Sequence, residues 1–98
     1  MAKYDDFSVL VQSLKPTFIM LSESWLSPAI PDTLVAINGY TLFRNDRDGR
    51  RGGGVCIFVA DLICSSFTIN ILSSEVGNNE ALFLKLSNSS ISFVLGCI

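Results

Sequence analysis

Apolar positions near the start of the chain follow a helical period. Between residues 4 and 14 they recur three or four positions apart, which places them on one face of a helix. Asp5 and Asp6 fall in its first turn, where carboxylates complement the helix dipole, and Pro16 cannot continue a helix. The pattern predicts a short helix over residues 4–14.

The rest of the chain carries short apolar runs that favour strands. The first, residues 17–21, is apolar almost throughout, which is typical of a central strand covered on both faces. We also expect a polar loop at residues 73–79. The sequence therefore predicts an α+β or α/β fold, with one short helix followed by five to six strands of a mixed sheet. The further expected strands are residues 40–44, 55–60, 64–71, 81–86 and 91–98.

Length and ending indicate a partial domain. The chain has 98 residues, enough for one small domain. Residues 91–98 form an apolar run that continues to the last residue without a closing loop. Because an exposed apolar strand edge promotes aggregation, we expect residues 1–98 to be a single, partial and truncated domain.

Composition excludes several classes of protein. Hydrophobic residues make up 49% and charged residues 16% of the chain, which is too apolar for a disordered protein. The low charge indicates a surface that packs against a neighbour. No apolar run approaches the ~20 residues of a membrane span, so we expect no membrane contact.

The first residues and the cysteines predict an intracellular protein. Asp5 and Asp6 lie where a signal peptide would carry basic and then apolar residues. Cys56, Cys64 and Cys97 lie in apolar runs without the spacing of metal ligands, which is typical of reduced, buried thiols. The sequence does not distinguish the nucleus from the cytoplasm.

The sequence contains no histidine. This excludes catalytic triads built on histidine and most zinc sites. Any catalysis would depend on carboxylates, on a metal held by carboxylates, or on a thiol. Glu23 is the first candidate, because it directly follows the expected strand at residues 17–21. An acid at a strand end can hold Mg²⁺ together with waters and substrate phosphate, or it can simply face solvent or accept backbone hydrogen bonds.

A glycine-rich segment carries most of the basic residues. Arginines beside flexible backbone can contact phosphates, although two aspartates among them, at 46 and 48, offset part of the charge. The alternative is a solvated strand connection whose glycines permit a tight turn. The net charge of −2 disfavours tight DNA binding by the chain alone. The candidate nucleic-acid contacts are Arg44, Arg47, Arg50 and Arg51.

Two further residues have alternative interpretations. Trp25 could stack on a base or a sugar, or pack at the rim of the core. Glu80, which leads into the strand expected at residues 81–86, could be a second acid at the end of the sheet or a structural partner for an arginine.

An ordered series of short motifs resembles one family. The motifs are Glu-Ser-Trp-Leu at residues 23–26, Ile-Pro-Asp at 30–32, Asn-Gly-Tyr at 38–40, Arg-Asn-Asp-Arg at 44–47, Gly-Gly-Gly-Val at 52–55 and Glu-Ala-Leu-Phe at 80–83. With them the chain is similar, over about residues 7–98, to the N-terminal half of the endonuclease/exonuclease/phosphatase domain in non-LTR (jockey-type) retrotransposon reverse transcriptase polyproteins.

The resemblance implies a fold and an activity. It implies a partial four-layer α/β sandwich and Mg²⁺-dependent cleavage of DNA, with Glu23 as the catalytic metal ligand and the bound metal polarising the scissile phosphate. Of the family's other site residues, a metal-ligating Asn belongs to a strand before the helix, where this chain has only residues 1–3, and a Tyr follows the last strand. An Asp-x-Asn pair, a later Asp and a His belong to the missing second half. We therefore expect an inactive fragment that needs that half. The alternatives are a weak nucleic-acid or partner-binding module and a non-functional remnant.

Overall fold

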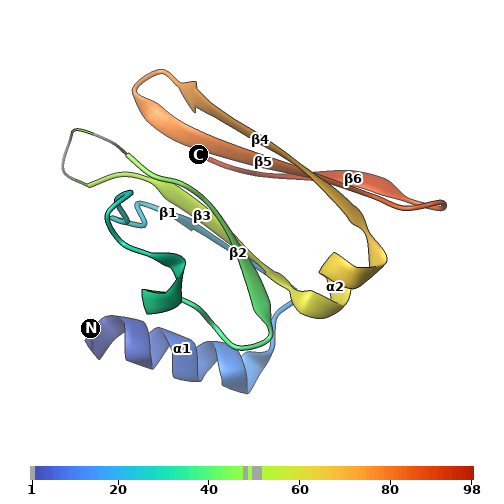
Figure 1. Cartoon of the computed structure of the whole chain (residues 1–98), viewed down its shortest axis with the longest axis horizontal. Helices are drawn as coiled ribbons and strands as arrows, with labels where there is room; N and C mark the ends of the chain where they lie inside the picture. Colours follow the sequence, from blue (N-terminus) through green and yellow to red (C-terminus); the bar gives the residue numbers. More distant parts are fainter. Residues whose placement is uncertain (1, 48, 50–51) are drawn as a thin grey trace.

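The computed structural model describes residues 2–47, 49 and 52–98, and residues 2–5 by their backbone alone. The elements, in chain order, are α1 (Ala2–Leu14), β1 (Phe18–Ser22), the short 3-10 helix η1 (Asp32–Leu34), β2 (Tyr40–Asn45), β3 (Val55–Ala60), α2 (Asp61–Ser66), β4 (Thr68–Val76), β5 (Asn79–Ser87) and β6 (Ser92–Cys97). Figure 1 shows three layers, with α1 against one sheet and the second sheet on that sheet's other face.

The described strands form two three-stranded sheets, ordered β1-β3-β2 and β4-β5-β6. Every pairing is antiparallel. The α+β class is confirmed, but the single mixed sheet is replaced by two antiparallel ones. One reason is that the connections β2–β3, β4–β5 and β5–β6 are short, whereas parallel neighbours need a crossover of a dozen or more residues, usually a helix. Between described strands, the one α-helix is α2, six residues long, and it links the two sheets.

β3 is the central strand of its sheet and is covered on both faces. Val55, Ile57 and Val59 face the second sheet. Cys56 and Phe58 face α1. The prediction that residues 17–21 form the central strand was wrong, because β1 lies at the edge of the sheet and Met20 is 46% exposed. The central place goes to the run that can bury apolar side chains on both faces.

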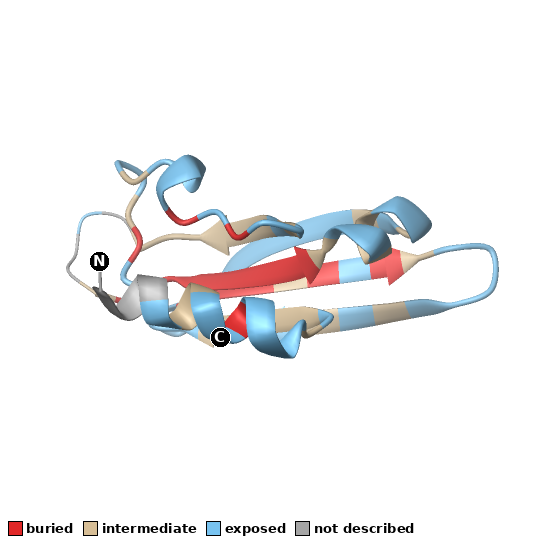
Figure 2. Ribbon diagram, turned by 90° about the horizontal axis from the view of Figure 1, so that it is seen from below, coloured by how far each residue is buried: buried red, intermediate tan, exposed pale blue. Residues whose placement is uncertain are grey.

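The main core lies between the sheets. Buried residues gather along β3 and β5, as Figure 2 shows. Alternate residues of β5 point into this core, as expected for a strand with two different faces. The largest fully buried side chains of β5 are Leu82, Leu84 and Leu86.

The segment between β3 and β5 differs from its prediction. Residues 64–71 were expected to be a strand, yet the chain forms α2 up to Ser66 and only then enters β4. The loop expected at residues 73–79 is also wrong, because β4 continues to Val76 and pairs with β5 through a two-residue turn. β4 is an edge strand whose residues are almost all exposed, so its polar side chains do not indicate a loop.

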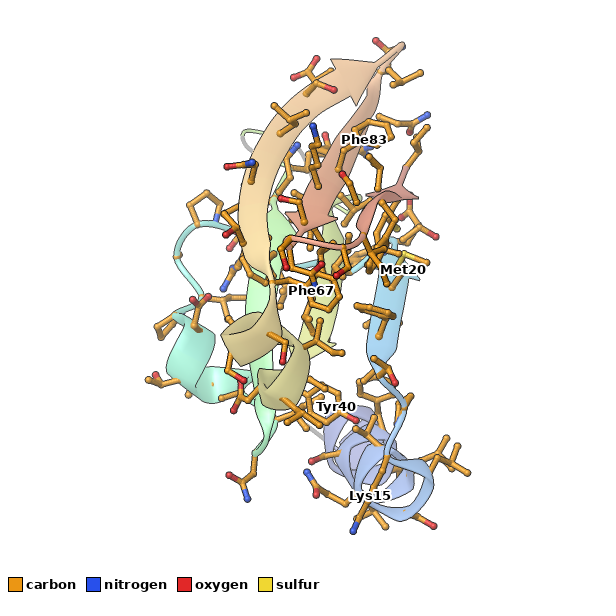
Figure 3. The ribbon with its side chains drawn as sticks, turned by 90° about the vertical axis from the view of Figure 1, so that its right-hand side faces the viewer. Lys15, Met20, Tyr40, Phe67 and Phe83 are labelled. Carbon is orange, nitrogen blue, oxygen red and sulfur yellow. The ribbon has the colours of Figure 1, made fainter. Side chains whose placement is uncertain are left out.

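The outer face of the sheet β4-β5-β6 stays open to solvent. Leu72, Phe83 and Gly96 lie directly across from one another on this face. Leu72 is 62% and Val94 59% exposed. Phe83, labelled in Figure 3, lies over Gly96, where an added Cβ would meet the ring at 2.5 Å. We call these four residues the outer apolar face.

In the part of the chain that the structure describes, no helix has the length and apolar character needed to span a membrane.

Candidate functional site

Glu23 lies directly after β1, in a backbone conformation that few residues adopt. Its φ is +56°, in the left-handed region. The next two residues are fixed by hydrogen bonds to the glycine segment: Ser24 donates its N–H to Gly54 O at 3.0 Å, and Trp25 donates its N–H to Gly53 O at 2.8 Å. The Glu23 side chain returns to the same segment, because its Oε2 accepts the Gly53 N–H at 3.2 Å.

The glycines opposite Glu23 are required by sterics. Gly53 and Gly54 both have positive φ, +72° and +81°. A Cβ at Gly53 would lie 2.3 Å from Cζ of Arg47, and a Cβ at Gly54 would lie 2.8 Å from Oγ of Ser24. Only glycine lets this backbone approach both neighbours while it presents its N–H groups to carboxylates.

Glu80 supports the same backbone from the second sheet. Its Oε1 accepts the Gly54 N–H at 2.8 Å, and Arg47 Nε donates to both carboxylate oxygens at 3.1 and 3.2 Å. These interactions lower the pKa of Glu80, with the Gly54 N–H as the largest cause and the Arg47 guanidinium next, against the opposing effect of burial. Glu80 is thus a structural partner for an arginine, as one of the two sequence interpretations held.

A small pocket of about 160 Å³ lies between these groups. Its lining includes Glu23, Glu80 and Arg47, together with Asn79 and Ile98 from the second sheet. Glu80 is 6% exposed and its charge is matched by Arg47, whereas Glu23 is exposed. Glu23 is therefore the carboxylate of this pocket that can meet a ligand from solvent.

These residues fit Mg²⁺ only as a partial site. Among the described residues no group of three or more His, Cys, Asp and Glu side chains is arranged to hold a metal ion. Glu80 is engaged by Arg47 and by the Gly54 N–H. The Gly53 N–H bonds to Oε2 of Glu23 and not to Oε1. Mg²⁺ is commonly held by one or two carboxylates plus waters and substrate phosphate, so Glu23 fits a single protein anchor.

The candidate arginines do not form one basic surface within the described chain. Arg44 donates to Asp46, to Asp32 and to the Ser27 carbonyl, and so fastens the loop before η1 to β2. The hydrogen bonds to Asp46, the larger cause, and to Asp32 raise the pKa of Arg44. Arg47 is paired with Glu80. Arg50 and Arg51 lie outside the described residues.

Trp25 stands beside Glu23 and is largely exposed. The side chain is 57% exposed, and the residue has a φ of +59°. The edge of its indole lies against Gly52, where an added Cβ would meet Cζ2 at 3.3 Å. Of the two sequence interpretations, packing at the rim describes one edge of the ring, and most of its surface faces solvent.

A larger pocket, of about 410 Å³, lies at the opposite end of the sheet β1-β3-β2 and contains none of the candidate residues. Lys15 and Tyr40, both labelled in Figure 3, line it. The Tyr40 hydroxyl donates to the Pro16 carbonyl and so closes the start of β1 against β2.

Sequence reasoning missed Asn45. Its Nδ2 donates to Ser74 O at 3.0 Å and to Ala81 O at 2.9 Å, which joins the end of β2 to both strands of the β4–β5 hairpin. An asparagine beside a turn-like segment is ordinary in sequence, so only the packing of the two sheets reveals this role.

No family model matches the sequence, and no curated protein is similar enough to indicate its family.

Proposed function

We propose that this chain is part of a metal-dependent phosphodiesterase domain, of the DNA endonuclease type found in retrotransposons, and that it is inactive alone. The observation that carries the proposal is the arrangement of Glu23. A strand-end acid is held by the Gly53 N–H at the mouth of a pocket that also contains Arg47. When bound, Mg²⁺ would polarise the scissile phosphate and stabilise the charge that develops on it. Glu23 would anchor the ion.

The residues present account for anchoring but not for a complete reaction. A phosphodiesterase also needs a group that activates water and a group that stabilises the leaving oxygen. Glu80 is committed to Arg47 and Gly54, and the sequence has no histidine. The proposed activity therefore needs further protein, which we take to be the second half of the same domain.

The surface of the chain supports such a partner. The accessible surface is 6153 Å², whereas a compact protein of this mass exposes about 5,500 Å². The excess of about 650 Å² approaches the ~800 Å² that one partner buries in a standard interface. The outer apolar face is where we propose that this second half packs, because a sheet face of this kind needs a covering layer.

We also propose an intracellular location. Cys56, Cys64 and Cys97 are free thiols in the structure, which is the state that a reducing compartment maintains.

Manganese titration followed by ¹⁵N–¹H correlation spectra tests the metal anchor. Mn²⁺ replaces Mg²⁺ at oxygen sites and broadens nearby amide signals. We expect broadening confined to residues 22–25 and 52–54, and its loss in Glu23→Gln. Glu75→Gln, which removes an exposed carboxylate from β4, is the matched control and should keep the broadening. Broadening that is unchanged in Glu23→Gln would contradict the proposal.

Plasmid nicking tests the inactivity of the chain alone. We expect no conversion of supercoiled to open-circular DNA with Mg²⁺ and 98-residue protein. Nicking that needs Mg²⁺ and is lost in Glu23→Gln would show that the missing groups are not required.

A further inference from the structure

The backbone around Trp25 directs a large apolar ring into solvent. Tryptophan is among the more buried residues on average, yet this side chain is 57% exposed. A positive φ is an outlier for a bulky residue, and here the chain holds it with the hydrogen bond from Trp25 N–H to Gly53 O. Strained conformations of this kind persist where the surrounding structure fixes them, and they gather at functional sites.

The ring is positioned as well as exposed. One edge of the indole lies against Gly52, at a point where a methyl group would already be 3.3 Å from Cζ2. The absence of a Cβ there lets the ring approach the glycine backbone closely. Trp25 therefore presents an aromatic surface from a defined place rather than from a freely rotating loop.

That place is next to the proposed metal anchor. Glu23 and Trp25 are two residues apart, so their Cα atoms lie within about 7 Å of each other. Both residues are fixed to the same glycine segment, Glu23 through the Gly53 N–H and Trp25 through the Gly53 carbonyl. A ligand whose phosphate reaches a metal ion at Glu23 can therefore place its adjoining group on the indole.

We propose that Trp25 is a stacking platform for an unpaired nucleobase of the strand whose phosphate would be held by a metal ion at Glu23. The inference rests on the proposed function and adds a substrate class to it: single-stranded or locally opened nucleic acid. A base offers a flat π face that matches the indole, and stacking on an aromatic side chain is tolerant of sequence. In an intact duplex both faces of each internal base are already stacked, so the platform favours an opened strand.

The chain provides its own reporter, because Trp25 is its only tryptophan. The probe is a twelve-nucleotide oligothymidylate, added at low salt with Mg²⁺, and the readout is indole fluorescence. We expect quenching that saturates with the single strand, and at least several-fold weaker quenching at equal concentration with the matched dA·dT duplex. Equal quenching by both, or none by either, would overturn the inference.

Binding of a labelled oligothymidylate, measured by fluorescence anisotropy, distinguishes stacking on Trp25 from non-specific binding to apolar surface. We expect Trp25→Phe to keep most of the affinity. Trp25→Leu should bind about 10-fold more weakly, which is within the loss expected when one base no longer stacks on an aromatic ring. Leu14→Ala, which removes an exposed side chain of α1, is the control and should leave binding unchanged. Equal affinity in Trp25→Leu and wild type would overturn the platform.

Gly52→Ala tests the position of the ring without changing it chemically. The variant should reduce quenching, because the new methyl group displaces the indole. Gly77→Ala is the matched control, since Gly77 also has a positive φ, +63°, but open space around it. Quenching that is unchanged in Gly52→Ala would show that the ring position does not matter, and would contradict the proposal.

The two proposals fail separately. Absence of quenching with intact Mn²⁺ broadening would overturn the stacking platform and leave the metal anchor. Quenching that persists while Glu23→Gln leaves Mn²⁺ broadening unchanged would overturn the nuclease assignment and leave Trp25 as a nucleic-acid contact. A peptide rich in aromatic residues that quenches as strongly as the oligonucleotide would indicate a protein ligand and overturn the nucleobase.

Discussion

The Arg47 guanidinium and the Glu80 carboxylate form an ion pair across the two sheets, with Nε 3.1 Å from Oε2. Both side chains are largely buried, 15% and 7% exposed. Arg47 belongs to the connection between β2 and β3, and Glu80 to the start of β5. Because Glu80 also accepts the Gly54 N–H, the pair fixes the glycine segment that in turn holds Glu23. The second sheet therefore positions the candidate site on the first.

This ion pair predicts how stability depends on pH. The pKa of Glu80 in the folded chain lies below its ordinary value of 4.5, first through the Gly54 N–H and then through Arg47. A carboxyl whose pKa is lowered by folding stabilises the fold fully above its unfolded pKa, and this contribution is lost as the pH falls through the folded pKa. We expect the urea concentration at the midpoint of unfolding to decrease as the pH is lowered below 4.5. In Glu80→Gln this decrease should be smaller.

The control for this prediction is an exposed ion pair. Asp32, whose side chain is 67% exposed, pairs with Arg44. Asp32→Asn should lower stability at pH 7 by less than about 1 kcal/mol. Urea unfolding curves of the two variants from pH 7 to pH 3 give the comparison. An equal pH dependence in wild type and Glu80→Gln would show that Glu80 does not contribute it.

The glycine segment predicts a second difference between matched variants. Gly53→Ala combines an unfavourable φ with a methyl group 2.3 Å from Arg47 Cζ, whereas Gly77→Ala has the unfavourable φ alone. The conformational penalty is about 1–2 kcal/mol for either residue. We expect Gly53→Ala to lose at least 1 kcal/mol more in urea unfolding. Equal losses would mean that Arg47 moves away without penalty.

Some of the fold could be predicted from the sequence because the signal was local. β3 was predicted as residues 55–60 and has those bounds, since a continuous apolar run between glycines and a charged residue, Asp61, has one good interpretation. The first helix was predicted from its apolar period and begins two residues earlier. The pairing of Glu80 with an arginine was one of two open interpretations, and the structure confirms it.

The rest could not be predicted because it depends on distant residues. Residues 64–71 are as apolar as a strand, and only the change from one sheet to the other makes their first part helical. The left-handed backbone of Glu23 is held by Gly53 and Gly54, about thirty residues later, so no nearby motif indicates it. The two contacts of Asn45 likewise exist only once both sheets are packed.

The two faces of the β4–β5 hairpin predict a large and a small loss of stability for the same leucine-to-alanine substitution. Leu84 is fully buried between the sheets, and Leu72 lies on the outer apolar face at 62% exposure. Leu84→Ala should lower the free energy of unfolding by about 2–5 kcal/mol. Leu72→Ala should change it by no more than ~0.5 kcal/mol. If Leu84→Ala does not fold, Leu84→Met can be measured in its place, and its free energy of unfolding should fall by less than about 1.5 kcal/mol.

A large loss in Leu72→Ala would contradict this arrangement, because it would mean that the outer apolar face is covered in the isolated protein. Sedimentation equilibrium of the wild type over a range of concentrations is the accompanying control, since association of two copies would cover the face and produce the same loss.

The three thiols predict a graded reactivity. Cys56 is 1% exposed, and burial is the main cause that raises its pKa to about 12. Since the thiolate is the reactive form, Cys56 is almost entirely in its unreactive protonated form at pH 8. Cys64 and Cys97 are half-buried, and burial also raises the pKa of Cys97.

We expect a disulfide reagent at pH 8 to modify Cys64 first and Cys97 more slowly. Cys56 should react at least 10-fold more slowly than either. In concentrated urea all three should react at similar rates. Mass spectrometry of alkylated peptides assigns the sites, and modification of Cys56 at the rate of Cys64 in the native protein would show that β3 is not the buried centre of its sheet.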